Sequence, residues 1–501
     1  MIDPRTPVVV GVGEVDQRVD PHDAREPIAL FADAVRAADA DTGRPGVLLS
    51  RADTVAAVQI VSWPYADAGA RVSQELGIEP RRTVMSTVGG NSPQLLVNEM
   101  AADIATGAAD VVVIGGGESM HARWRARREP RVHLEWPVDD GAPCPNIVGD
   151  PRPGTNDFEQ AHSAVAPTHI YPLFETGLRA AAGRTVEAHQ RVVGALWSRF
   201  AEVAAANPHA WSRTPHSAEA ITTPTAENRM VVFPYTKRMC ANIDVDQGAA
   251  VLLCSYEAAR DAGIAEDRMV FLHAGADAHD HWFVTERAAL AEAPAIGIAT
   301  RAALAAASVG IDDIARFDLY SCFPAAVEMA MQALGLRGVE HGDERPLTVT
   351  GGLGFAGGPV NNYPTHGIAR MVDACRADPG SFGLTTALGW YATKHSVGVW
   401  SSRAAERFVR VDPAVTQAEV DALPGREPSG LFDGAMTIEA TSVVMERDGR
   451  PSLAIVAGLL ADGRRGLANS RDPDVMTAMT REAWEGRTVH VGNDGTTNLL
   501  R

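Results

Sequence analysis

The chain has 501 residues, of which 46% are hydrophobic and 22% charged, so it is long enough for two to four packed units and has a globular composition. Its formal net charge of −18 argues against nucleic acid or anionic membrane surfaces as partners, and no stretch approaches the roughly 20 apolar residues of a membrane span. Five cysteines without paired spacing, and a start that lacks a signal-peptide pattern, predict a reduced, cytoplasmic protein.

Alternating strands and helices are expected from the N-terminus onward. Apolar runs predict a strand at residues 8–12, a helix over about 27–38 and a strand at 55–62, followed by a helix that ends near Leu76. Strands that alternate with helices in this way indicate an α/β fold.

Residues 85–120 continue the pattern as loop, helix, turn and strand. A glycine turn (GGN, residues 89–91) leads into Ser92-Pro93, which is typical of a helix start. Gly107 ends this helix, and the apolar run at 110–114 is expected in a central strand. A helix N-terminus that follows a glycine turn offers backbone amides to an anion or a developing oxyanion.

The run AADIATGAADVVVIGGGESM (residues 101–120) resembles the thiolase superfamily. In that family the preceding helix carries the nucleophilic cysteine at its N-terminus, and the family's spacing puts this cysteine at Gly90. The resemblance covers about residues 5–402. It implies an α/β thiolase fold, in which two duplicated βαβαβαββ halves form five layers and a loop domain is inserted.

The duplication also has support within the sequence itself. Residues 52–62 match residues 311–321 at a constant offset of 259, and each segment opens a predicted β/α unit. We assign the first half to residues 1–257, with the loop domain over about 121–245, and the second half to residues 258–402.

The inserted segment begins with a cluster of arginines in an otherwise acidic chain: Arg123, Arg125, Arg127, Arg128 and Arg131. The thiolase family places its coenzyme A-binding loop domain here, so the first four are expected to bind phosphates of coenzyme A. A solvated face that pairs with acidic neighbours is the alternative.

Residues 403–501 predict a small β-rich domain, for which a barrel is one arrangement. Asp448-Gly449 and Asp462-Gly463 are strong hairpin signals between apolar runs. Thiolase-like proteins of type 1, a sterol-carrier-thiolase-like group, carry an added C-terminal domain in this place, so the chain resembles that group.

The catalytic motifs of thiolases map onto altered residues. Gly90 has no side chain to acylate, and the histidine that activates the nucleophile falls at Gly358. The backbone at Gly90, Asn91, Gly358 and Gly389 is expected to bind the thioester oxygen. In the family's second motif, here YSCF, Cys322 resembles the acid/base thiol of the sterol-carrier thiolases.

Three further residues complete the expected site. Tyr320 stands where the second motif has histidine or asparagine. Lys394 is one of only two lysines in the chain and adjoins His395, in a turn expected to overhang the cleft. His395 is a candidate for a displaced general base.

No metal site is expected. Histidines and aspartates gather at His273, Asp277, His279, Asp280 and His281, but no predicted helix or strand arranges them as ligands.

The resemblance implies an acyl-CoA acyltransferase-family protein, similar to acetyl-CoA acetyltransferases of lipid metabolism. Coenzyme A or an acyl-CoA would be its ligand, with no covalently bound cofactor. The missing cysteine and histidine should close the ping-pong route of thiolases. Three functions stay open: an acyltransferase of altered mechanism, a non-catalytic binder of CoA thioesters or acyl lipids, and a partner subunit joined through the C-terminal domain. We expect a monomer or homodimer.

Overall fold

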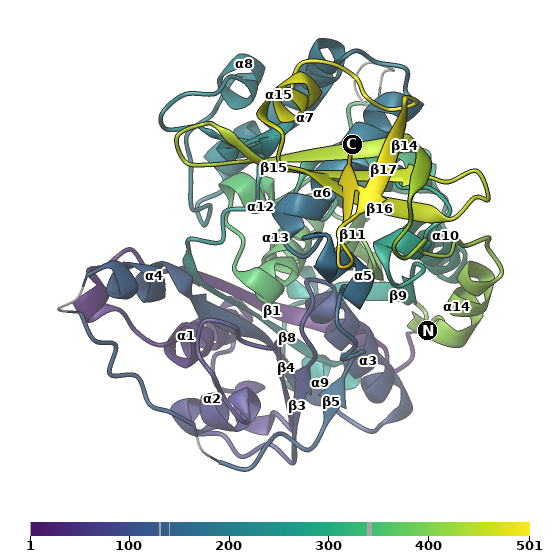
Figure 1. The fold of residues 1–501 in the computed structure, drawn as a ribbon. Helices are drawn as coiled ribbons and strands as arrows, with labels where there is room; N and C mark the ends of the chain where they lie inside the picture. The colour runs from purple at the N-terminus through teal and green to yellow at the C-terminus, as the bar shows by residue number, and fades with distance from the viewer. Residues whose placement is uncertain (1, 130–131, 140, 338–342) are drawn as a thin grey trace.

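The computed structural model describes residues 2–129, 132–139, 141–337 and 343–501, which form two α/β halves and a β-rich body packed on them (Figure 1). The main sheet has 11 strands, in the order β10-β11-β12-β9-β1-β8-β4-β2-β3-β5, with β13 paired to β9. These strands are β1 (Pro7–Asp16), β2 (Thr54–Ala57), β3 (Arg82–Ser86), β4 (Val111–Ser119), β5 (Ile147–Val148), β8 (Asp246–Ser255), β9 (Val270–His279), β10 (Ile314–Asp318), β11 (Phe382–Gly389), β12 (Lys394–Ser401) and β13 (Val409–Arg410).

Helices pack between and outside the two halves of this sheet, so that helices and strands form alternating layers. Two helices lie in the middle and contact strands of both halves: α3 (Ser92–Thr106) and α13 (Tyr363–Ala377). The first half is covered on its outer side by α1 (Pro27–Asp41), α2 (Ala68–Leu76) and α9 (Tyr256–Asp261). The second half is covered by α10 (Pro294–Ala307) and α14 (Pro413–Asp421). The predicted five-layered fold of two α/β halves is therefore confirmed.

Local signals place most boundaries of the first half correctly. Helix α3 begins at Ser92 and ends where Gly107 adopts φ = 82°, a left-handed conformation that favours glycine. The strand predicted at 55–62 stops at Ala57, however, because the amides of Val61 and Ser62 donate to the Glu118 carboxylate at 2.8 and 2.7 Å rather than to a neighbouring strand.

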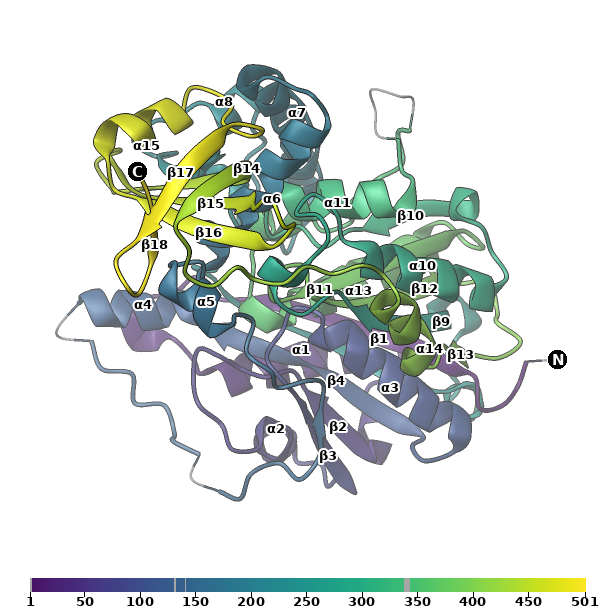
Figure 2. The same ribbon diagram turned by 45° about the vertical axis from the view of Figure 1, so that its right-hand side comes forward.

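The inserted segment and α11 form a helical body above the halves (Figure 2). It contains α5 (Asp157–Ala161), α6 (Pro167–Ala181), α7 (Val186–Ala206), α8 (Ala218–Thr222), β6 (Met230–Phe233) and β7 (Tyr235–Thr236). The first helix of the insertion, α4 (Met120–Arg128), instead lies beside the first half and contacts β8. Helix α11 (Pro324–Leu334), from the second half, contacts both α6 and α7. The short helix α12 (Gly352–Phe355) packs on α7.

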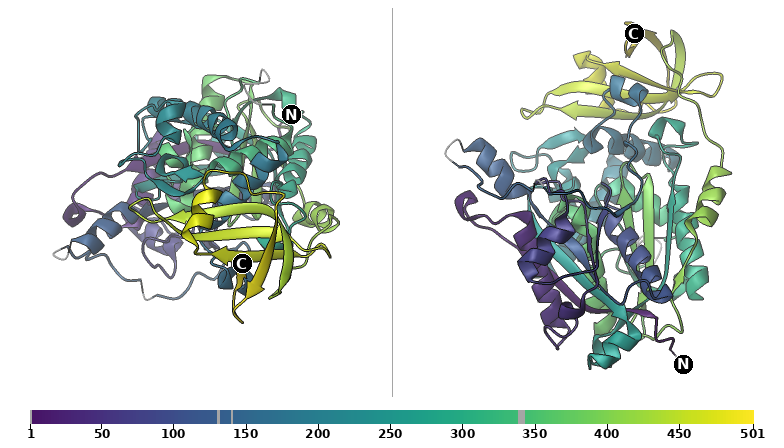
Figure 3. Two further views of the ribbon diagram at one scale, coloured as in Figure 1. Left: turned by 45° about the horizontal axis from the view of Figure 1, so that its top comes forward. Right: turned by 90° about the horizontal axis from the view of Figure 1, so that it is seen from below.

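A second sheet closes into a small barrel at the end of the molecule away from the N-terminus (Figure 3). Its order is β15-β16-β18-β17-β14, and β14 also pairs with β15, so that the five strands form a ring; the β6–β7 hairpin extends the sheet from β14. The elements are β14 (Gly434–Met445), β15 (Pro451–Leu459), β16 (Arg465–Ser470), α15 (Pro473–Met479), β17 (Thr488–Asn493) and β18 (Asn498–Leu500). Both predicted Asp-Gly turns connect barrel strands.

Buried polar bonds attach this barrel to the second half and to the helical body. Arg465 has no exposed surface and donates to both carboxylate oxygens of Glu439, at 2.8 and 3.1 Å, and to main-chain carbonyls of residues 284–288. Arg179 of α6 forms a buried ion pair with Glu485. Charged groups are buried at such low exposure only when they are paired, so these bonds specify how the barrel docks. Within the described ranges, no helix has the length and hydropathy needed to cross a bilayer.

Candidate active site

The position of the expected nucleophile is closed by a tyrosine. A Cβ atom built on Gly90 would lie 2.3 Å from the Tyr320 hydroxyl oxygen and 2.5 Å from the Leu388 carbonyl oxygen. Both distances are far below van der Waals contact between carbon and oxygen. A side chain at position 90 therefore requires both Tyr320 and the end of β11 to move.

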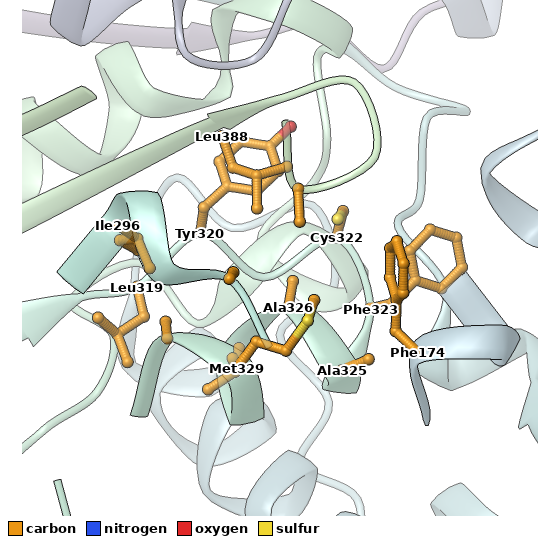
Figure 4. Close-up of a cluster of buried hydrophobic side chains, with 14 of the residues drawn as sticks. Phe174, Ile296, Leu319, Tyr320, Cys322, Phe323, Ala325, Ala326, Met329 and Leu388 are labelled. Atoms are coloured by element: carbon orange, nitrogen blue, oxygen red, sulfur yellow. The ribbon is translucent and has the colours of Figure 1, made fainter. Parts of the chain in front are cut away.

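Tyr320 is held in this place from several sides. Its amide donates to Thr386 Oγ1 at 3.0 Å, and its ring meets Tyr363 edge-on at 5.6 Å between centroids. The side chain is buried with Leu388 and Cys322 close by (Figure 4). Burial, with a smaller contribution from Cys322, raises the pKa of Tyr320 well above its usual value, so the phenol is neutral at pH 7.

Cys322 is a protonated, buried thiol. It hydrogen-bonds to the Tyr171 hydroxyl, and burial raises its pKa to about 12. Tyr171 in turn donates to the Trp390 carbonyl at 3.1 Å and accepts from the Ala392 amide at 3.2 Å. Cys322 is thus linked through one tyrosine to the turn before β12, and it is able to donate a proton but not to act as a thiolate at neutral pH.

Lys394 is the first residue of β12 rather than part of the preceding turn, and it lies beside the glycine turn of residues 89–91. Its Nζ donates to the Val88 carbonyl at 2.6 Å, and burial lowers its pKa to about 8. Cβ atoms built on Gly89 and Gly389 would lie 2.9 and 3.0 Å from Lys394 Cε, so its side chain fills the space that both glycines leave open. The Asn91 side-chain oxygen borders the same space and is buried without a hydrogen-bond partner among the described residues.

His395 points away from Lys394. The two residues are consecutive in β12, opposite Leu388 and Gly389 of β11, and neighbouring strand residues face opposite sides of a sheet. His395 Nε2 lies 3.1 Å from the Ala392 carbonyl and 3.4 Å from Asp280, which accepts a hydrogen bond from the first turn of α10. Its ring is therefore enclosed between the sheet and α10 instead of lining the site with Lys394.

The expected glycine backbone site is only partly assembled. Gly389 and the Asn91 side chain adjoin Lys394, whereas Gly90 adjoins Tyr320 and the Leu388 carbonyl. The Gly358 amide instead donates to the Asn242 carbonyl at 2.9 Å, so it is already bonded.

Asn361 is a positioning residue that the sequence did not distinguish from a turn asparagine. Its Oδ1 accepts from the Gly89 amide at 2.9 Å, and its Nδ2 donates to the Gln59 carbonyl at 2.8 Å. An asparagine shortly after the glycine run was the available signal, and its buried side chain ties this segment of the second half to Gly89 and Gln59 of the first.

The arginines of α4 lie on the surface. Arg123 donates to the Val61 carbonyl at 3.1 Å, and Arg125 lies 3.4 Å from Glu129, whereas Arg127 and Arg128 are exposed. Arg131 falls outside the described residues. No α4 arginine is part of the helical groove described next.

The helical body contains a groove of about 820 Å³ between α6, α7 and α11. Its lining is largely apolar and includes Leu178, Leu196, Met331, Leu336 and Leu347. The charged lining residues are Arg184, Arg199, Glu202, Glu328 and Arg337. A smaller hollow of about 380 Å³ shares Leu196, Arg199 and Leu347 with it. The sequence did not reveal this groove, because the apolar faces of its helices show the same spacing as faces buried in a core.

Comparisons with known proteins agree with the architecture. A family model described as "Thiolase-like protein type 1 additional C-terminal domain" matches residues 416–496. The chain is 34% identical to a monomeric SCP2-thiolase like protein type 1 from Mycobacterium smegmatis, with 100% of each chain covered and a TM-score of 0.85. Among curated proteins, no sequence matches the chain.

More distant structures share the fold. An Ltp2-ChsH2(DUF35) aldolase is 21% identical with a TM-score of 0.61, and covers 80% of this chain and 99% of its own. An acetyl-CoA acetyltransferase from Syntrophomonas wolfei is 14% identical with a TM-score of 0.56, and covers 79% of this chain and 99% of its own.

Proposed function

The chain belongs to the SCP2-thiolase-like proteins of type 1, and from this membership we propose that it binds coenzyme A thioesters or related acyl ligands without the cysteine-dependent chemistry of thiolases. The observation that carries the proposal is the contact between Gly90 and Tyr320. A Cβ at position 90 would lie 2.3 Å from the Tyr320 hydroxyl, so the nucleophile is absent and its space is filled. Loss of a nucleophile costs many orders of magnitude in covalent mechanisms.

The groove between α6, α7 and α11 supports the binding part of the proposal. Its volume of about 820 Å³ lies in the usual range of small-molecule sites, and its apolar wall suits an acyl chain. Arg199 and Arg337 in its lining offer positive charge to phosphate or carboxylate groups. In this arrangement the acyl chain occupies the groove and the charged part of the ligand lies at its mouth.

A second candidate, an acyl-CoA enzyme of altered mechanism, is favoured by Lys394. With a pKa of about 8, a substantial fraction of this amine is neutral near physiological pH and therefore nucleophilic. Tyr320 and Cys322 are neutral proton donors in the same region. His395, on the opposite face of β12, would influence such a site only through the turn before the strand.

Titration calorimetry with acetyl-CoA and dodecanoyl-CoA, together with chromatography of released coenzyme A, separates the candidates. We expect saturable binding of dodecanoyl-CoA without release of coenzyme A. The double variant R199A/R337A should bind at least tenfold more weakly, and the matched surface variant R127A/R128A should bind as the wild type does.

Each other result has a definite meaning. Weaker binding in R127A/R128A alone would move the ligand to α4, as the sequence first indicated. Release of coenzyme A that disappears in Lys394→Met would favour the enzyme, and the absence of any binding would refute both candidates.

We also propose that the protein is a monomer. Strand β5 pairs with β3 at the end of the main sheet, through Met85–Ile147 and Ser86–Val148, and so covers the edge that β3 would otherwise offer to a second chain. Light scattering that gives twice the mass of 53.1 kDa would contradict this.

A further inference from the structure

Three ionisable side chains from three different helices converge inside the helical body. They are Glu175 of α6, His189 of α7 and Glu328 of α11, and one ligand atom from each lies within 4.8 Å of the other two. His189 Nε2 is 2.5 Å from Glu175 Oε1 and 3.8 Å from Glu328 Oε2. This is the combination of imidazole and carboxylates that binds divalent transition metals such as zinc.

Both carboxylates of this cluster are largely shielded from water and lie close to His189. Glu175 is completely buried, and only 14% of the Glu328 side chain is exposed. Arg184 lies 3.9 Å from Glu328 Oε1 and contributes a positive charge beside the cluster. Buried carboxylates need a compensating charge or a shared proton, and a divalent cation provides such a charge for both.

Two buried atoms of the cluster, His189 Nδ1 and Glu328 Oε2, lack a hydrogen-bond partner among the described residues. Glu328 Oε2 is buried and accepts no hydrogen bond from any described residue, although it points to within 3.8 Å of His189 Nε2. Ligand atoms in a tetrahedral zinc shell, with bonds of about 2.0–2.1 Å, are about 3.3 Å apart. Small side-chain rotations that lengthen the His189–Glu175 distance and shorten the His189–Glu328 distance produce this spacing.

The residues around the cluster provide a hydrogen bond to one of the proposed ligands and a path by which an ion can enter. The Tyr235 hydroxyl donates to Glu175 Oε2 at 2.6 Å, which orients the carboxylate as outer hydrogen bonds orient metal ligands. Glu328 also lines the groove between α6, α7 and α11, so an ion and a water ligand reach the cluster from that side.

We propose that Glu175, His189 and Glu328 form a binding site for a divalent transition metal ion, of which Zn²⁺ is the best match. The site lies outside the expected catalytic residues, and its ligands come from chain positions that no sequence motif connects. Glu328 is shared with the groove wall, so zinc binding is measured without acyl ligand and its outcome does not depend on the proposed function.

The test is the metal content of the full-length protein after dialysis against Zn²⁺, followed by calorimetric titration of the metal-free protein. We expect one zinc ion per chain and a thermal unfolding midpoint that rises with zinc, since the ion binds the folded state. Glu328→Gln, which preserves shape, should bind zinc at least tenfold more weakly. Tyr235→Phe should weaken binding by roughly tenfold, as outer-ligand changes do.

Glu202→Gln is the matched control, because Glu202 lines the same groove outside the cluster and its loss should leave zinc binding unchanged. His189→Gln gives a second ligand variant, and circular dichroism of each variant verifies folding. A wild-type protein that retains no zinc, or equal zinc affinity in E328Q and wild type, overturns the site; the two carboxyl groups then share a proton instead.

Discussion

The expected thiolase pocket and the helical groove differ in how much open volume they contain. In the pocket, Tyr320 fills the space beside Gly90, and Lys394 fills the space beside Gly89 and Gly389. Between α6, α7 and α11, about 820 Å³ stays open behind an apolar wall. The comparison shows that a conserved backbone arrangement does not by itself preserve a reaction. The side chains decide which cavity stays open to a ligand.

The largest expected effect comes from restoring the cysteine. Gly90→Cys should lower the free energy of unfolding by about 3 kcal/mol, because overpacking against Tyr320 and the Leu388 carbonyl forces a shift of the surroundings. Urea denaturation measures this loss.

Gly358→Ala is the matched control for that change. Its new Cβ would meet no atom closer than 3.4 Å, so the loss should stay below about 1 kcal/mol. Adding Tyr320→Ala to G90C should recover part of the stability, and equal stability of G90C and wild type would show that the pocket is open after all.

A second effect tests the buried amine of the closed pocket. Burial lowers the pKa of Lys394 to about 8, below its unfolded value, so between pH 8 and 10.5 the unfolded chain binds more protons and stability rises with pH. The rise should be on the order of 3 kcal/mol and should be missing in Lys394→Met. Denaturant titrations at several pH values measure it, and parallel pH profiles of both proteins would contradict the assignment.

A third prediction addresses the groove. Ala195→Trp on α7 places an indole in the open space, so dodecanoyl-CoA should bind at least tenfold more weakly, which is about 1.4 kcal/mol. Unfolding stability should change by less than about 0.5 kcal/mol, because position 195 is exposed. Unchanged affinity would mean that the acyl chain binds elsewhere.

The smallest expected effect is at Cys322. A buried thiol with a pKa of about 12 should resist iodoacetamide at pH 8 in the folded protein and react only in denaturant. Mass spectrometry of the labelled peptides reads this out. Rapid labelling of the native protein would indicate an accessible thiolate and would reopen a role for Cys322 in catalysis.

Local features of the fold could be predicted from the sequence because they depend on neighbouring residues. Ser92-Pro93 begins α3 and Gly107 ends it through backbone geometry that those residues favour. The Asp-Gly turns of the barrel could be predicted for the same reason, because these two residues favour the backbone conformation of a hairpin turn. Repetition at a constant offset then indicated two halves, and the structure confirms them.

Other features were decided only by tertiary contacts between distant parts of the chain. Adjacent in sequence, Lys394 and His395 face opposite sides of a strand, and only the packing of α3 and α10 decides what each side chain meets. Tyr320 fills the space at Gly90 from another half of the molecule. The groove and the Glu175–His189–Glu328 cluster exist because three separate helices pack together, and side-chain contacts of that kind have no local pattern in the sequence.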